Sequence, residues 1–356
     1  MTNAILEVSA LTRPWGGIDP FLFCAHHLDR YPASDGAMGV PLPKLGGRPL
    51  GNDFSNQDGF SQYFGERVPG FPAHPHRGFE TITYLRRGHV DHSDSMGATA
   101  RYGAGDVQWL TAGRGIQHAE MFPLLDRGPD NTLELFQIWF NLPASDKFVE
   151  PEFKMLWGEQ LPVWRQADPQ DASAINEVTV IAGTLTPAGG KPLQPPSPPR
   201  HSWAAREDSE VAIWVLRLSP GQRLSLPAAV RDDTRRVLHV FAGETLRVDG
   251  QELPAQQSIE LRATSTCEVE NNGSSLLEIM LMQGRPIGEP VAAGGPFVMN
   301  TDAELHQARV DYGRTSFGGW PWQGPAPVHP ADADRFARYP GSNTIELPPS
   351  AQVPRT

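Results

Sequence analysis

The sequence has little cysteine, no long apolar run and no excess of positive charge. Only two cysteines occur among the 356 residues, so a disulfide framework is excluded as the main source of stability. Neither Cys24 nor Cys267 belongs to a Cys-x-x-Cys pair, and both are interpreted as buried thiols. No apolar stretch approaches the roughly 18 residues that span a membrane, and the N-terminus lacks a basic segment followed by an apolar one. We therefore predict a cytoplasmic protein with no membrane partner.

The charge balance is acidic, with a formal net charge of −11 at pH 7. A chain of this sign lacks the basic surface by which proteins hold nucleic acid or anionic lipid. We therefore predict no direct nucleic-acid partner, and interpret the charge as that of an ordinary acidic enzyme surface.

Glycine and proline are abundant, with 35 of each. Both residue types interrupt regular structure, which favours short strands joined by turns over long helices. Segments typical of strands recur at residues 80–85, 107–111, 116–121, 133–140, 211–218 and 279–282. This pattern predicts an all-β protein of the antiparallel sandwich or barrel type.

An internal repeat indicates that the barrel occurs twice. Phe71-Pro-Ala73 matches Leu226-Pro-Ala228, and Leu110 matches Leu261 after a shorter turn. We predict a first barrel over residues 1–170 and a second over 171–300. Residues 301–356 are expected to form a docked helix and an irregular tail.

Two histidine-containing pairs carry the chemistry of the first copy. His74-Pro-His76 lies at the start of an expected strand, and His118-Ala-Glu120 follows on another. Alternate residues of a strand point to the same side, so each pair can project both side chains into a barrel. Three imidazoles and a carboxylate suit one divalent first-row metal ion, and the residues alone allow Fe, Mn, Co, Ni, Cu or Zn.

The second copy acts as an internal control for this interpretation. The repeat places Ala229, Arg231, Val269 and Asn271 where the first copy has its four ligand-type side chains. None of these residues could rebuild the site, so the second barrel is expected to be metal-free.

Other polar and aromatic residues rank lower as site candidates. His26 and His27 could face a substrate at the barrel mouth, whereas His89 and His92 are expected on an exposed hairpin. Glu80 and Gln137 lie on expected strands and could point into the pocket, but the alternation of side chains along a strand does not by itself decide between the two faces. The aromatic residues of these strands are interpreted as core; they are Trp109, Phe136 and Trp139.

The assembled motifs resemble those of the pirin family of bicupin proteins. His74-Pro-His-Arg-Gly-Phe-Glu-Thr81 and Gly105-Asp-Val-Gln-Trp-Leu-Thr-Ala-Gly-Arg-Gly115 are similar to the family's N-terminal cupin motifs. Gly284-Arg-Pro-Ile-Gly-Glu-Pro290 and Gly295-Pro-Phe-Val-Met-Asn300 are similar to its C-terminal signature. The resemblance covers most of residues 70–315. Two segments, residues 37–62 and the chain beyond residue 318, are longer than in the family pattern and could cover the mouth of the site.

The resemblance implies a bicupin of two jelly-roll-type β-barrels with few short helices. It also implies Fe(2+) bound by His74, His76, His118 and Glu120, and a quercetin 2,3-dioxygenase activity known for several members. The leading hypothesis is an Fe(2+)-dependent dioxygenase that acts on a flavonol-type aromatic substrate with O2, with Glu120 accepting the hydroxyl proton. The alternative is a redox-responsive metal-binding regulator that acts through a protein partner. A third hypothesis is a metal-dependent isomerase or other cupin enzyme on a small acid.

Overall fold

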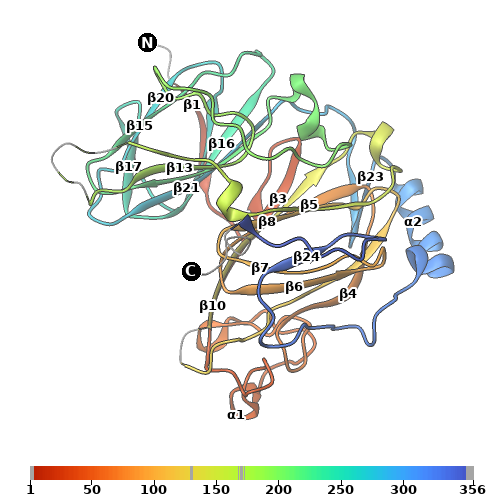
Figure 1. Cartoon of the computed structure of the whole chain (residues 1–356). Helices are drawn as coiled ribbons and strands as arrows, with labels where there is room; N and C mark the ends of the chain where they lie inside the picture. Colours follow the sequence, from red (N-terminus) through yellow and green to blue (C-terminus); the bar gives the residue numbers. More distant parts are fainter. Residues whose placement is uncertain (1–3, 129–130, 167, 169–170, 172, 350–356) are drawn as a thin grey trace. The chain divides into compact units, whose positions relative to one another are not determined.

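The computed structural model describes residues 4–128, 131–166, 168, 171 and 173–349, and nearly all of its regular structure is β-strand (Figure 1). The chain groups into two compact units. The first unit comprises residues Ala25–Glu159 and Glu289–Thr356, and the second comprises Met1–Cys24 and Gln160–Gly288. The expectation of an all-β fold with few short helices is confirmed.

Two antiparallel sheets form the first unit. One has the order β11-β8-β5-β10-β3 and the other β24-β7-β6-β9-β4. Buried side chains from both sheets share one core, including Leu85, Val90, Tyr102, Leu110 and Ile116. The strands are β3 (Phe21–Tyr31), β4 (Gly70–His76), β5 (Phe79–Arg87), β6 (His89–Asp94), β7 (Thr99–Gly103), β8 (Asp106–Thr111), β9 (Ile116–Met121), β10 (Asn131–Asn141), β11 (Glu152–Leu156) and β24 (Phe336–Arg338).

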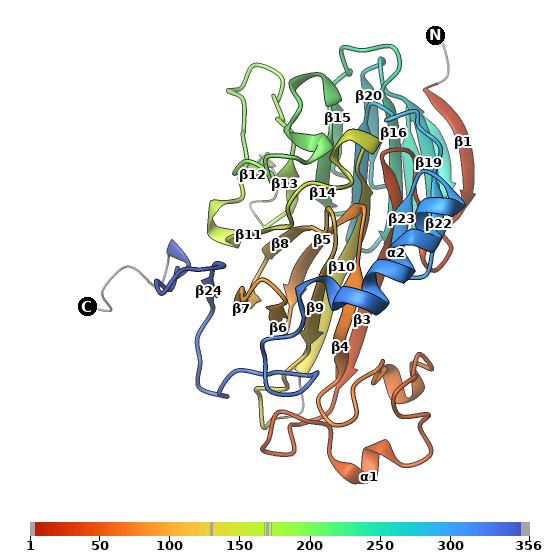
Figure 2. The same ribbon diagram turned by 90° about the vertical axis from the view of Figure 1, so that its right-hand side faces the viewer.

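The remaining elements of the first unit are short, except for one helix. The helix α2 (Asp302–Thr315) begins with a capping box between Thr301 and Glu304, and lies beside β22 (Ala292–Gly294) and β23 (Phe297–Met299) (Figure 2). The others are α1 (Leu42–Leu45) and the 3-10 turns η1 (Gln57–Gly59), η2 (Ala144–Asp146), η3 (Gly158–Gln160) and η6 (Ser316–Gly318). None of the described helices is both long and apolar enough to cross a membrane.

The second unit is built in the same way from a seven-stranded and a four-stranded sheet. Their orders are β1-β19-β16-β21-β14-β13-β12 and β15-β20-β17-β18, and apolar residues of both sheets form a shared core. The bounds are β1 (Ile5–Ala10), β2 (Trp15–Gly16), β12 (Val163–Arg165), β13 (Asn176–Ala182), β14 (Ala212–Leu218), β15 (Arg223–Leu226), β16 (Arg235–Ala242), β17 (Thr245–Val248), β18 (Gln251–Pro254), β19 (Gln257–Arg262), β20 (Cys267–Glu270), β21 (Leu277–Gly284), η4 (Trp203–Ala205) and η5 (Glu207–Ser209).

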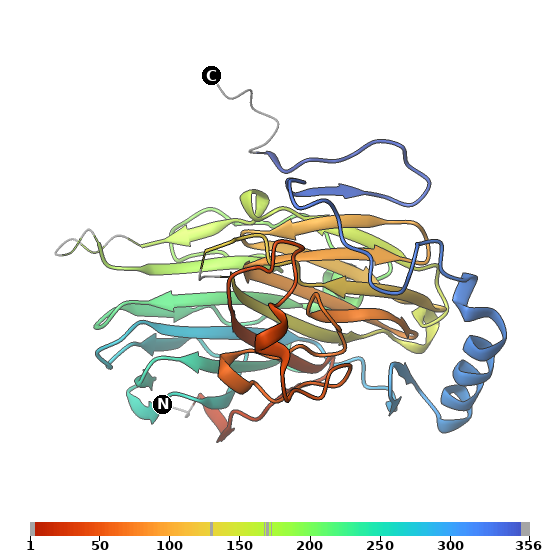
Figure 3. The same ribbon diagram turned by 90° about the horizontal axis from the view of Figure 1, so that it is seen from below.

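Both ends of the chain group with segments that are far away in the sequence. The N-terminal strand β1 pairs antiparallel with β19, so the first residues belong to the second unit. At the other end, the chain after α2 returns over the strands of the first unit, where β24 pairs with β7 (Figure 3). Both pairings join segments that are far apart in sequence, which no local pattern reveals.

Candidate metal centre

The pairs His74/His76 and His118/Glu120 lie on adjacent strands. β4 and β9 run antiparallel, and His74 of β4 is directly opposite His118 of β9. A register shift between Phe71 and His74 accompanies the prolines of this strand, because proline cannot donate to the ladder. The shift leaves His74 and His76 on the face that His118 also takes.

The three imidazoles converge on one point. Their ligand-type nitrogen atoms all lie within 4.8 Å of one another. The ring centroids are separated by 4.7 Å between His74 and His76, 4.5 Å between His74 and His118, and 4.8 Å between His76 and His118. Such a cluster is what a single metal ion requires of histidine ligands.

Hydrogen bonds determine which nitrogen atoms remain available. Nδ1 of His74 lies 2.9 Å from the carbonyl oxygen of Pro72, and Nδ1 of His76 lies 3.2 Å from that of Pro296. A carbonyl only accepts, so both rings carry the proton on Nδ1 and present Nε2 as the lone pair. His118 is fully buried, and neither of its ring nitrogens has a hydrogen-bond partner among the described residues.

Burial keeps these rings neutral. Desolvation lowers the pKa of His74 to about 4, and lowers the pKa of His76 and His118 well below the usual range. Neutral imidazole is the form that binds metal ions. The unpartnered nitrogens of the buried His118 and the neutral donor set therefore fit a single transition-metal site.

Glu120 lies beside the histidines but is oriented by other residues. Its Oε1 accepts a hydrogen bond from Oγ1 of Thr83 at 3.2 Å, and its Oε2 accepts one from Nε2 of Gln137 at 2.7 Å. Oε2 lies 3.9 Å from Nε2 of His118, and desolvation raises the pKa of the carboxyl group. Among the described residues, the close cluster of metal-ligand atoms comprises the three histidines without Glu120.

His92 is a buried neighbour of this site, and its expected place on an exposed hairpin is wrong. Its strand, β6, pairs with β7 on one side and with β9 on the other, which places His92 opposite Glu120. Nε2 of His92 lies 3.3 Å from Oδ2 of Asp94, and its ring stacks on Phe153 with centroids 4.9 Å apart. His118 and Glu120 lie on β9, and His92 lies opposite Glu120 on β6. This grouping depends on the register of the two strands, which the sequence alone does not reveal.

Strand β10 contributes two side chains to the same side of the first unit. Gln137 reaches Glu120, and Trp139 packs edge-on against His76 with centroids 5.4 Å apart. Both are partly exposed, so Trp139 is not fully buried core as expected. Trp109 and Phe136 are fully buried, as expected, and Glu80 is buried with Oγ1 of Thr111 donating to it at 2.6 Å.

The two histidines of β3 face different surroundings. His26 stacks on Phe136 and lies 3.2 Å from Glu134. Nδ1 of His27 lies 2.7 Å from the hydroxyl of Tyr63, which in turn donates to Oδ2 of Asp29 at 2.7 Å. Tyr63 directly follows the long 37–62 stretch, so this addition to the chain reaches the strands of the first unit.

A further set of contacts fixes the end of the ligand strand. Gly78 takes a positive φ of 85°, and a Cβ there would lie 2.1 Å from the carbonyl oxygen of Val298. The buried Nζ of Lys147 donates to the carbonyl of Gly78 at 2.7 Å and to that of Val298 at 3.2 Å. β23 is thereby held against the turn that follows His76.

Comparison with known proteins gives a consistent result. The family model Pirin matches residues 42–140, and the model described as Pirin C-terminal cupin domain matches residues 213–318. The chain is 36% identical over 243 residues to the Pseudomonas aeruginosa protein named "Putative quercetin 2,3-dioxygenase PA2418", covering 68% of this chain and 77% of that protein. It is 34% identical over 294 residues to a pirin-like protein of Caulobacter vibrioides, covering 80% and 95% of the two chains.

Human Pirin is also a relative, 34% identical over 260 residues that cover 71% of this chain and 79% of the human protein. Among solved structures, the fold is similar to that of a quercetin 2,3-dioxygenase from Acinetobacter baumannii, with a TM-score of 0.64 and 24% identity. That match covers 89% of this chain and 98% of the other.

Proposed function

Because this chain belongs to the pirin family, we propose that it is a metal-dependent dioxygenase that oxidises a flavonol-type aromatic substrate with O2. The single observation that carries this proposal is the convergence of three neutral imidazoles, with both nitrogens of the buried His118 unpartnered among the described residues. The quercetin dioxygenase name of the Pseudomonas aeruginosa relative supports the substrate class.

The proposed metal ligands are His74, His76, His118 and Glu120. The proposed ion is Fe(2+), and the donor set also admits Mn, Co, Ni, Cu and Zn. When bound, such an ion supplies Lewis acidity and a template for the substrate oxygen and O2.

The protein side chains would handle the proton of the substrate. Glu120 is the proposed acceptor of the hydroxyl proton, and its raised pKa favours holding that proton once it is transferred. Gln137 and Thr83 donate to its two oxygens and so orient the carboxyl group. Trp139, partly exposed beside His76, offers an aromatic surface for a planar substrate.

The experiment is metal analysis of the purified protein, followed by oxygen uptake and loss of quercetin absorbance after anaerobic loading with Fe(2+). We expect about one metal ion per chain and turnover in the wild type. His76→Ala should lower metal affinity by more than about 100-fold, since losing a ligand costs more than losing its outer partner. His306→Ala, which changes an exposed histidine of α2, is the matched control.

Equal metal content in wild type and in a variant lacking all four proposed ligands would overturn the site. Metal binding without turnover of any flavonol would instead contradict the dioxygenase and favour the redox-responsive regulator. A metal-dependent pull-down of one defined partner protein would then identify that function.

A further inference from the structure

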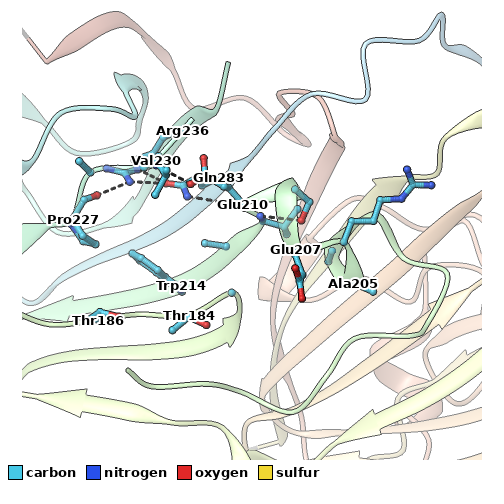
Figure 4. Close-up of a pocket in the computed structure, with 18 residues that line it drawn as sticks. Thr184, Thr186, Ala205, Glu207, Glu210, Trp214, Pro227, Val230, Arg236 and Gln283 are labelled. Atoms are coloured by element: carbon cyan, nitrogen blue, oxygen red, sulfur yellow. Dashed lines mark hydrogen bonds between the residues drawn. The ribbon is translucent and has the colours of Figure 1, made fainter. Parts of the chain in front are cut away.

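The second unit contains a cavity of about 450 Å³ that the proposed dioxygenase chemistry does not use (Figure 4). Its wall is formed by strands β14, β16 and β21, by the turn after β13, and by the segments at residues 204–211 and 227–230. Most of the lining side chains are small or apolar, and several are alanines. One of them, Ala229, is the residue that the internal repeat aligns with His74.

A buried cation lines this cavity without a carboxylate partner. The side chain of Arg236 is 1% exposed, and its Nε and Nη2 donate to Oε1 of Gln283 at 2.8 and 2.5 Å. Nη2 also donates to the carbonyl of Pro227 at 2.7 Å (Figure 4). Both acceptors are neutral, and Nη1 has no hydrogen-bond partner among the described residues. Burial lowers the pKa of Arg236 to about 10, so the group remains charged at neutral pH.

A second buried donor lies on the same wall. Trp214 is 3% exposed, and its Nε1 has no acceptor among the described residues. Buried polar atoms without partners are rare because each loses its hydrogen bonds to water and gains none in return. Two such donors lining one cavity, one of them cationic, indicate that an acceptor group from a ligand completes them.

The charge of the nearby Glu210 acts on Arg236, but the Glu210 carboxylate is engaged by other groups. Glu210 accepts from the backbone N–H groups of Val230 at 2.7 Å and Arg231 at 3.0 Å, and from the hydroxyl of Thr234. Its carboxylate therefore holds the 230–234 loop and makes no ion pair with Arg236. The other charged lining residues, Arg206 and Glu207, are exposed and of opposite sign.

We propose that this cavity binds a small organic monocarboxylate. The carboxylate oxygens would accept from Nη1 of Arg236 and Nε1 of Trp214, and the apolar part of the ligand would pack on the alanine-rich wall. Both donor atoms lie beneath the cavity surface, so binding requires the 227–234 loop to shift. Val230 of this loop is 89% exposed, so its side chain adds little packing, and the hydrogen bonds to Glu210 are what this shift would have to rearrange. The Arg236 guanidinium of the second unit would then bind an anionic ligand, whereas the first unit would bind its ligand through a metal ion.

The test is isothermal titration of the full chain with benzoate as the probe, with neutral benzamide as the comparison ligand. We expect saturable benzoate binding and at least about tenfold weaker binding of benzamide, because benzamide lacks the negative charge that strengthens a hydrogen bond from a cation. Arg236→Met should weaken benzoate binding by about 10- to 100-fold, and Trp214→Phe by about fivefold.

Arg235→Met is the matched control, because it removes the same charge from the neighbouring residue of β16. Arg235 pairs with Glu260 at 2.9 Å and does not line the cavity, so benzoate binding should be unchanged. Ala229→Phe fills the cavity while Arg236 stays in place, and it should abolish binding even where Arg236→Met fails to fold.

Three outcomes would overturn the proposal. The first is an absence of benzoate binding at millimolar concentration, and the second is binding that Arg236→Met and Ala229→Phe leave unchanged. The third is loss of benzoate binding in His76→Ala, which would place the probe at the histidine cluster. The titration is independent of dioxygenase activity, so failure of one proposal leaves the other standing.

Discussion

Single hydrogen bonds determine which histidine nitrogens of the candidate metal centre are available to bind a metal ion. The carbonyls of Pro72 and Pro296 fix the Nδ1 protons of His74 and His76, whereas both nitrogens of His118 remain unpartnered among the described residues. Glu120 has two donors of its own and lies 3.9 Å from His118. Its proposed role as a metal ligand therefore differs from that of the three histidines, whose ligand atoms form the close cluster.

We predict that Glu120→Gln lowers metal affinity by about 10- to 100-fold and removes turnover. The amide has nearly the same shape but neither the negative charge nor the basicity that the two proposed roles need. Competition with a chelator measures the affinity, and oxygen uptake measures the activity. Glu150→Gln, at an exposed site, should leave both unchanged. Wild-type metal affinity and activity in Glu120→Gln would remove this residue from the site.

One buried arginine connects the C-terminal segment to the strands of the first unit. Arg101 of β7 makes a two-pronged ion pair with Asp91 of β6, with both N–O distances 2.7 Å and both side chains fully buried. Its remaining N–H groups donate to the carbonyls of Pro330 and Ala333 at 2.7 and 3.0 Å. The irregular chain before β24 is therefore held by separate hydrogen bonds, several of them from Arg101, rather than by a continuous ladder.

We predict that Arg101→Met destabilises the first unit by about 3–5 kcal/mol, because Asp91 would keep a buried negative charge without its cationic partner. Urea denaturation measures the loss, and limited proteolysis should cut first near residues 329–335. Arg67→Met breaks an ion pair with Asp35 whose arginine side chain is 62% exposed, and should cost less than about 1 kcal/mol. Equal effects of the two substitutions would contradict this account of the tail.

Buried neutral histidines occur in both units and set how the whole chain responds to acid. Burial lowers the pKa of His27, His74 and His239 to about 4 in each case. Below about pH 6.5 these histidines become protonated in the unfolded chain but stay neutral in the folded chain. Their contribution to stability is therefore lost as the pH falls toward 4. Asp29 has the opposite effect on stability. Burial raises its pKa to about 6, so its carboxyl group destabilises the folded chain as the pH rises from about 4 to 6.

His239 isolates one such contribution, because it belongs to the second unit, whereas the candidate metal centre belongs to the first. We predict that wild type loses about 2 kcal/mol more unfolding free energy than His239→Asn between about pH 7.5 and pH 5. Urea denaturation at the two pH values measures the difference, and His306→Ala, at an exposed histidine, should follow wild type. Identical pH dependence in His239→Asn and wild type would show that this ring does not titrate as described.

The sequence by itself determined the strand content and the candidate ligands. Alternation along 74–76 and 118–120 is a local property, since side chains two apart on any strand share a face. The missing histidines at the repeated positions, such as Ala229, are equally readable from the residues alone. The all-β fold and the close approach of His74, His76 and His118 were therefore predictable.

Only the tertiary structure decided which strands are neighbours. β9 lies between β4 and β6, which brings His92 to Glu120, and β1 joins β19 rather than the first unit. The same holds for Arg236, whose lack of a carboxylate partner depends on where Gln283 and Pro227 fall. The physical reason is that periodicity acts along the chain, whereas register and ion pairing depend on segments far apart in sequence.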